Sequence, residues 1–177
     1  MARDLLGKIL VRESADGIVA IRLTEVEAYL GIDDPACHTF RGRRTSRTET
    51  MWGEAGRAYI YLIYGIHHCL NAVTVGEGVP EAVLIRGGEP LTGGRQIRLR
   101  RGLKVSRRNL LDGPGKLCQA MALTRDEDRI DLCDPATGLT IRSDGHDITN
   151  ERVERLPRVG IDYADEAAAW PLRMMVR

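Results

Sequence analysis

The chain has 177 residues, of which 43% are hydrophobic and 29% charged, and its formal net charge at pH 7 is +1. This length and balance predict one folded domain over residues 1–177, and they exclude a wholly disordered chain or one that depends on disulfides to fold. No stretch approaches the roughly 18 apolar residues of a membrane span, and the first residues lack the apolar run of a secretory signal.

The predicted elements begin with a short helix over residues 2–8 and strands over residues 9–12 and 18–26. A polar, Gly- and Arg-rich stretch over residues 32–57 is predicted to be a long loop with little core of its own. Further strands are predicted over residues 58–63, 68–75, 82–86, 140–143, 159–162 and 172–176, and helices within 93–108 and over 115–123. Strands outnumber helices without alternating with them, which predicts an α+β domain with a curved, mainly antiparallel sheet flanked by helices.

Charge is unevenly distributed along the chain. Residues 1–116 carry 18 Lys and Arg against 13 Asp and Glu, whereas residues 117–177 carry 8 against 12. Two runs concentrate the positive charge, residues 41–47 and residues 95–108. Such runs would bind phosphates in a salt-dependent way, although many charge runs are simply solvated surface.

Four residue patterns could carry chemistry. Glu25 and Glu27 share one face of a predicted strand, next to Tyr29, where a carboxylate could act as a general base on water; periodicity alone favours two solvated acids instead. Tyr59, Tyr61 and Tyr64 fall within six positions and could stack on bases, or else line a core.

The other two patterns concern phosphate and metal. The sequence of residues 113–117, GPGKL, places backbone amides and Lys116 at a helix start that could bind phosphate, but it lacks the GxxxxGK[ST] spacing of a P-loop. Cys37, His38 and residues 67–69 (HHC) could form a zinc site, but the spacing fits no familiar zinc module. Reduced, partly buried thiols are the simpler interpretation.

Several longer motifs, taken in order, closely resemble the alkyladenine (3-methyladenine) DNA glycosylase family. These motifs are EAYLG from Glu27, DDPACH from Asp33, RGR from Arg41, AYIYLIYGIHHCLN from Ala58, PEAVLIR from Pro80 and GPGKLCQA from Gly113. The resemblance covers nearly the whole chain. It implies a monofunctional glycosylase that flips alkylated or deaminated purines out of double-stranded DNA and hydrolyses the N-glycosidic bond with water, without a metal or an organic cofactor.

The resemblance also assigns roles to individual positions. Glu27 corresponds to the general base, Arg86 to the arginine that helps to place the water, and the main-chain carbonyl of Val176 to a third water partner. Four residues correspond to the base pocket and three to the DNA contacts. Tyr29, His38 and Tyr61 would sandwich the flipped base, Asn71 would clash with the 2-amino group of guanine, Tyr64 would fill the gap in the stack, and Arg41 and Lys116 would contact phosphate.

Two other classes of function stay open on the sequence. A non-catalytic module that binds damaged DNA would keep the basic face and Tyr64 but would not need Glu27. A metal-dependent hydrolase would use the Cys and His cluster. The resemblance further implies a monomer, located in the cytoplasm with the nucleoid if the source is bacterial and in the nucleus if it is eukaryotic.

Overall fold

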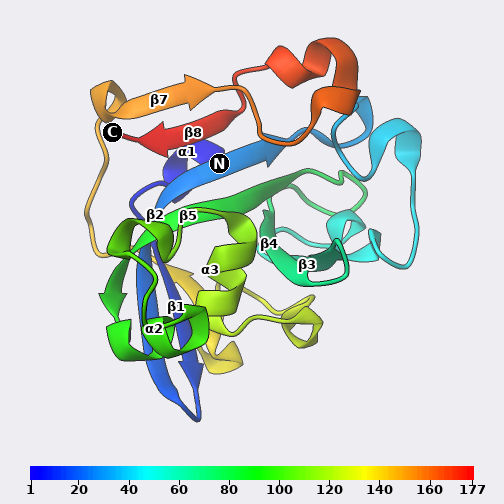
Figure 1. The fold of residues 1–177 in the computed structure, drawn as a ribbon. Coiled ribbons are helices and arrows are strands. Elements are labelled where there is room, and N and C mark those ends of the chain that lie inside the picture. The colour runs from blue at the N-terminus through cyan, green and yellow to red at the C-terminus, as the bar shows by residue number, and fades with distance from the viewer.

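The protein is described by a computed structural model that covers residues 1–177. Its centre is an eight-stranded sheet with the order β3-β4-β5-β2-β1-β6, in which β8 also pairs with β2 and β7. The strands are β1 (Ile9–Ser14), β2 (Gly17–Tyr29), β3 (Ala58–Ile63), β4 (His67–Val73), β5 (Ala82–Thr92), β6 (Leu139–Arg142), β7 (Val153–Leu156) and β8 (Arg173–Val176). Every strand pair is antiparallel, and the sheet is curled (Figure 1). The predicted α+β fold is therefore confirmed.

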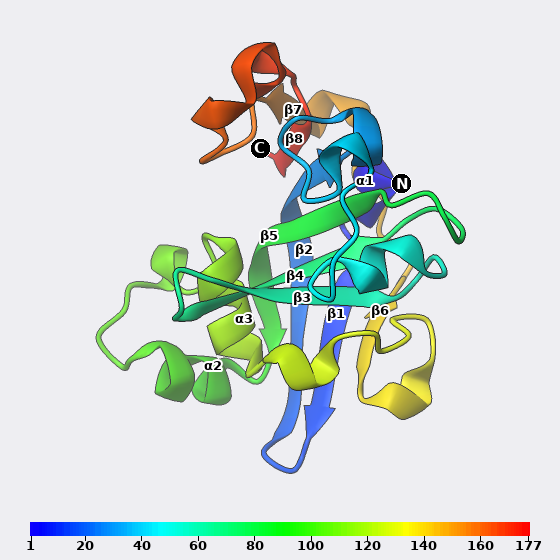
Figure 2. The same cartoon turned by 90° about the vertical axis from the view of Figure 1, so that its right-hand side faces the viewer.

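Three α-helices accompany the sheet: α1 (Ala2–Leu5), α2 (Gly94–Arg101) and α3 (Pro114–Met121). The remaining turns include 3-10 helices at Gly31–Asp33, Phe40–Gly42, Glu49–Trp52, Arg107–Asn109, Arg125–Glu127, Pro135–Thr137, Asn150–Arg152 and Asp162–Ala169. Helices α2 and α3 contact each other, and α3 packs against β4 and β5 (Figure 2). No helix combines the length and the apolar character needed to cross a bilayer.

The main core lies between the sheet and these two helices. Apolar side chains from β1, β2, β4 and β5 meet buried residues of α2 and α3, among them Ile97, Leu117 and Met121. Pro114 occupies the first turn of α3, where its missing N–H costs nothing. Because the helices cover this face of the sheet, polar side chains that point to the other face are free to build a site.

A β-bulge in β2 decides which side chains reach that other face. Val19, Ile21 and Leu23 point into the core at odd positions, but Val26 does so at an even one. The pairing register with β5 shifts on both sides of Glu25, as a bulge requires. If β2 alternated regularly from Val19 onward, its odd-numbered residues Glu25 and Glu27 would point into the core.

Strand β5 is longer than its predicted range of residues 82–86, because it continues through Gly87, Gly88 and Pro90 to Thr92. Glycine at position 88 has a packing reason, since a Cβ there would lie 2.7 Å from the Arg22 carbonyl oxygen. The two glycines that ended the predicted strand therefore allow β5 to lie close to β2.

Two other predictions need correction, and one strand was not predicted. Residues 32–57 do contribute a core, because Ala36, Cys37 and Met51 are buried together with four polar residues, Asp34, Thr39, Thr48 and Thr50. Residues 159–162 are not a strand; Gly160 adopts φ +74° and the chain enters a 3-10 helix. Strand β7 was missed because it is a four-residue strand that pairs only with β8.

Candidate active site

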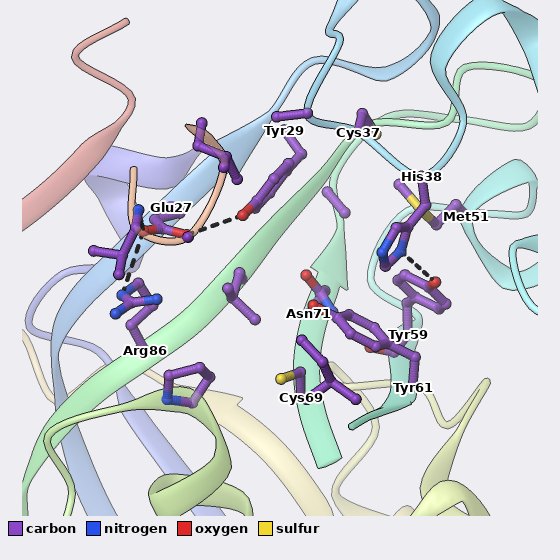
Figure 3. Close-up of a pocket in the computed structure, with 18 of the residues that line it drawn as sticks. Glu27, Tyr29, Cys37, His38, Met51, Tyr59, Tyr61, Cys69, Asn71 and Arg86 are labelled. Atoms are coloured by element: carbon purple, nitrogen blue, oxygen red, sulfur yellow. Dashed lines mark hydrogen bonds and ion pairs between the residues drawn. The ribbon is translucent and has the colours of Figure 1, made fainter. Parts of the chain in front are cut away.

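Glu27 is fully buried in β2 and makes three polar contacts there. Its Oε1 accepts a hydrogen bond from the Val159 main-chain N–H at 2.8 Å and lies 3.4 Å from Arg86 Nε. Its Oε2 accepts a hydrogen bond from the Tyr29 hydroxyl at 3.0 Å (Figure 3). A carboxylate has about four acceptor positions, so these contacts fix its orientation and still leave it able to bind a water molecule.

Burial raises the pKa of Glu27 above its ordinary value, and the positive charge of Arg86 and the two hydrogen bonds partly oppose this rise. The same Nε of Arg86 also donates to Glu25 Oε1 at 3.1 Å. Arg173 also binds that oxygen at 3.0 Å. The result is a basic carboxylate with a fixed cation next to it, which suits proton transfer from water.

A buried ion pair supports both hydrogen bonds to Glu27. The side chains of Asp34 and Arg158 are both 0% exposed, and Arg158 Nη2 donates to Asp34 Oδ1 at 2.8 Å. Arg158 also donates to the Ala28 carbonyl at 3.0 Å and lies over the Tyr29 ring, 4.8 Å from its centroid. Because Val159 follows directly in the chain, this ion pair anchors the residue that binds one oxygen of Glu27 and the ring that binds the other.

An aromatic pocket of about 210 Å³ opens beside Glu27 and Arg86. Tyr29, His38 and Tyr61 stand around it from three different segments (Figure 3). The His38 and Tyr61 rings meet edge to face, with centroids 4.7 Å apart and planes at 80°. The volume is below the ~300–1,000 Å³ typical of pockets for drug-sized ligands, and it suits one flat ring system.

His38 is a neutral wall of this pocket. Burial, with smaller contributions from Arg47 and Arg43, lowers its pKa to about 4, so the imidazole carries no charge at pH 7. Its Nδ1 lies 2.9 Å from the Tyr59 hydroxyl, and Tyr59 is itself buried. A pocket lined by uncharged aromatic rings attracts a cationic heterocycle rather than repelling it.

Asn71 lies in β4 at the floor of the pocket and is buried. Its Nδ2 donates to the Tyr59 carbonyl oxygen at 3.0 Å. This bond holds the amide in one orientation, so it cannot easily rotate away from a group that enters the pocket.

Two exposed tyrosines lie at the mouth of the pocket. Tyr64 is 84% exposed at the tip of the β3–β4 hairpin, where it has φ +53° and is followed by Gly65 at φ +71°. Two successive positive φ values are typical of a type I′ turn. Tyr163, from the 3-10 helix after Gly160, is 68% exposed and also lines the pocket. Tyr163 was not among the site residues predicted from the sequence.

The structure contradicts one predicted position, Val176. Strand β8 runs antiparallel to β2 with Arg173 opposite Glu27 and Met175 opposite Glu25. Val176 therefore lies about three residues, roughly 10 Å, along the strand from Glu27, and it lines a different hollow. The main-chain contact to Glu27 comes from Val159 instead.

The two predicted phosphate contacts lie outside the pocket. Arg41 is exposed in the loop after β2, with its guanidinium 5.1 Å from the centroid of the Phe40 ring. Lys116, in α3, pairs with Asp112 at 2.9 Å. Pro114, at the start of the same helix, does line the pocket, so Lys116 lies two residues from its rim.

Sequence reasoning missed Val159, Asp34, Arg158 and Arg47. Arg47 covers the Tyr61 ring, 4.9 Å from its centroid, and it belongs to the basic run over residues 41–47. Asp34 lies within the DDPACH motif, so its position could have been singled out. No local sequence pattern indicates Val159 as a site residue, because its contact with Glu27 joins residues 132 positions apart.

The cysteines and histidines that could have formed a zinc site do not converge. No group of three or more His, Cys, Asp or Glu side chains is arranged to hold a metal ion. All four cysteines are free, and Cys37 instead makes a 3.1 Å hydrogen bond with Thr39.

The chain is similar to known proteins along its whole length. The family profile described as methylpurine-DNA glycosylase (MPG) matches residues 1–177. A protein of Bdellovibrio bacteriovorus is 44% identical over 177 residues, which are 100% of this chain and 88% of that protein. A protein of Methanocella arvoryzae is 46% identical over 173 residues, which are 98% of this chain and 84% of that protein. Both carry the name "Putative 3-methyladenine DNA glycosylase".

A buried base beside a slot for one flat ring fits an enzyme that hydrolyses the bond between a base and its sugar, and the matches identify the class as the DNA glycosylases, hydrolases of DNA repair. Within that class, this chain belongs to the methylpurine-DNA glycosylase family. The resemblance found in the sequence is thereby confirmed.

Proposed function

We propose that this glycosylase removes alkylated or deaminated purines from double-stranded DNA, as a monomer, with water that Glu27 deprotonates. The observation that carries the proposal is the buried Glu27 carboxylate, bound by Arg86, Val159 and Tyr29 at the edge of an aromatic pocket. An oxocarbenium-like transition state at the sugar needs a nearby negative charge and a positioned water. Glu27 can provide both, and Arg86 can orient the water.

The neutral aromatic pocket favours cationic purines such as 3-methyladenine and 7-methylguanine. Tyr29 and Tyr61 offer electron-rich ring faces, and a desolvated cation–π contact contributes about 1–2 kcal/mol. Because His38 is uncharged at neutral pH, it does not oppose the positive charge of such a base. Damaged bases also cost less to unpair, so hypoxanthine and ethenoadenine fall within the same substrate class.

Asn71 supplies the discrimination against normal guanine in this proposal. Its amide is tied to the Tyr59 carbonyl, so a 2-amino group that entered the pocket would meet a side chain that cannot move aside. Adenine-like bases and hypoxanthine lack that group, whereas 7-methylguanine carries it and is accepted because the attraction of its positive charge to the aromatic rings offsets the clash. Arg41 and Lys116 act from outside the pocket as phosphate contacts, and Lys116 keeps its ion pair with Asp112 while another of its three N–H donors reaches a phosphate.

A panel of duplexes tests the proposal. Each duplex carries one lesion (3-methyladenine, 7-methylguanine, hypoxanthine or ethenoadenine), and an undamaged duplex is the control. The purified chain should release free base and leave an alkali-labile abasic site in at least one lesion duplex but not in the control. Tight binding of lesion duplexes without release of any base would instead identify a damage-recognition module.

Replacing Tyr64 with alanine should weaken the binding of lesion duplexes by a factor of about 5 to 150, because one stacking contact with a base is worth about 1–3 kcal/mol. The melting temperature should hardly change, since the side chain is 84% exposed and alanine keeps the same backbone constraint at positive φ. Fluorescence anisotropy and thermal melting measure the two effects.

Ile18→Ala is a suitable control for this variant, because Ile18 is 51% exposed at the β1–β2 turn and does not line the pocket. It should leave affinity unchanged. A Tyr64→Ala protein that melts far below the wild type but binds DNA normally would show that Tyr64 has a packing role instead.

A further inference from the structure

The protein has a second hollow, which is separate from the aromatic pocket. It has a volume of about 760 Å³ and lies between β2, β5, the α2–α3 loop and the C-terminus. Gly87 and Gly88 form part of its wall, so no side chain fills it there. We call this hollow the β5 groove.

Exposed arginine side chains line the β5 groove. Arg107 and Arg108 come from the α2–α3 loop; both are exposed and neither forms an ion pair. Arg152, from the segment before β7, is also exposed, and its Nη2 donates a 3.4 Å hydrogen bond to the main-chain oxygen of Arg177.

The acidic side chains that line the same groove are mostly neutralised. Glu25 binds Arg86 and Arg173, and Asp112 binds Lys116. Only Glu89 has no ion-pair partner among them. The groove therefore offers a net positive surface to a polyanion.

The β5 groove begins where the aromatic pocket ends. Arg86 lines the pocket, and the next residue, Gly87, lines the groove. Gly87 also forms a β-bridge with Asp112, in the segment that leads to α3. Because the two hollows adjoin at these consecutive residues, a DNA strand whose nucleotide occupies the pocket can continue into the groove.

We propose that the β5 groove binds the sugar-phosphate backbone of the lesion strand next to the flipped nucleotide, with Arg107, Arg108 and Arg152 as its phosphate contacts. This inference rests on the proposed function, because it assumes that the nucleotide enters the aromatic pocket. The glycine wall lets the backbone approach β5 closely. The contacts are sequence-independent, since they reach phosphates and not base edges.

The salt dependence of binding tests this proposal. The probe is a duplex with one tetrahydrofuran abasic-site analogue, which has no base to release. For Arg107→Ala/Arg108→Ala, the slope of log K against log [KCl] should fall by about 1.8, because each lost phosphate contact removes about 0.9. Arg152→Ala should remove about 0.9 by the same relation.

The matched control is Arg125→Ala/Arg155→Ala. It removes the same charge from two exposed arginines that form no ion pair and lie outside the groove. An equal fall in slope for this control would overturn the proposal, because the effect would then reflect net charge alone. An unchanged slope in the groove variants would also overturn it. Failure of the wild type to release any base would instead count against the proposed function.

Discussion

Replacing Glu27 with glutamine is expected to lower single-turnover base release by about 10²–10⁴-fold, the range typical of general acid–base catalysis. Glutamine keeps the size of the side chain but cannot take a proton from water. It can still accept hydrogen bonds at one oxygen from the Val159 N–H or the Tyr29 hydroxyl, so the pocket should keep its shape. Affinity for a lesion duplex should therefore stay within about threefold of wild type, because the contacts that hold the flipped base are unchanged.

Glu25→Gln is the internal control for this prediction. Glu25 lies two residues away on the same face and binds the same arginine, Arg86, but it does not line the aromatic pocket. It should cost far less activity than Glu27→Gln. Near-wild-type release by the Glu27 variant would refute its role, and equal losses in both variants would mean that the glutamates act only by holding Arg86.

The raised pKa of Glu27 also determines in which direction the rate of base release changes with pH. Burial raises the pKa of Glu27, whereas Arg86, the Val159 N–H and the Tyr29 hydroxyl act in the other direction. A base works only when it is ionised, so base release should fall as pH drops through this raised pKa. The acidic limb of the rate profile should therefore lie above the ordinary glutamate pKa of 4.5. The groups that face Glu27 are Arg86, Tyr29, Glu25 and Arg158.

Removing one partner of the buried Asp34–Arg158 pair should destabilise the protein by about 3–5 kcal/mol, because the other charge is then buried without compensation. For a chain of this size, each kcal/mol lowers the melting temperature by about 2–4 °C. Asp34→Ala should therefore melt roughly 6–20 °C below wild type. Below its melting temperature it should also release base more slowly, because Arg158 anchors Val159 and the Tyr29 ring. Thermal melting and single-turnover assays measure the two effects.

Two further variants test whether this ion pair only stabilises the fold or also positions Glu27. Glu49→Ala breaks an exposed pair with Arg44 and should leave both melting and activity unchanged. Asp34→Leu/Arg158→Met replaces the pair with apolar side chains, which often restores stability, but it should not restore the rate. A stable double variant with full activity would mean that the pair has no part in placing Glu27.

The elements with strong local patterns could be predicted from sequence. Strand β3 was predicted with its observed bounds, since alternating aromatic and β-branched residues over residues 58–63 indicate a strand. The shared face of Glu25 and Glu27 also follows from strand alternation. The roles of His38, Asn71 and Tyr64 could come only from the family resemblance, because no local pattern distinguishes a pocket residue from a core residue.

The wrong predictions concern segments whose structure depends on contacts between distant parts of the chain. Residues 159–162 are apolar enough to be read as a strand, but the Asp34–Arg158 pair and the bond from Val159 to Glu27 hold this segment as a loop. Val176 was misplaced because the register of β8 on β2 is a tertiary property. The sequence pattern does indicate the bulge, since the apolar positions of β2 change from odd to even after Leu23.

The bulge makes the length of β2 as important as its composition. Substitutions at exposed positions such as Ile18 change only the local surface, but deletion of a single residue between Leu23 and Val26 would make the alternation of β2 regular. Val26 would still face the core and Glu27 the pocket, but β2 would be one residue short against the segment of β5 from Gly88 to Ile85. Relatives that lose a residue here in β2 can therefore be expected to lose one in β5 as well.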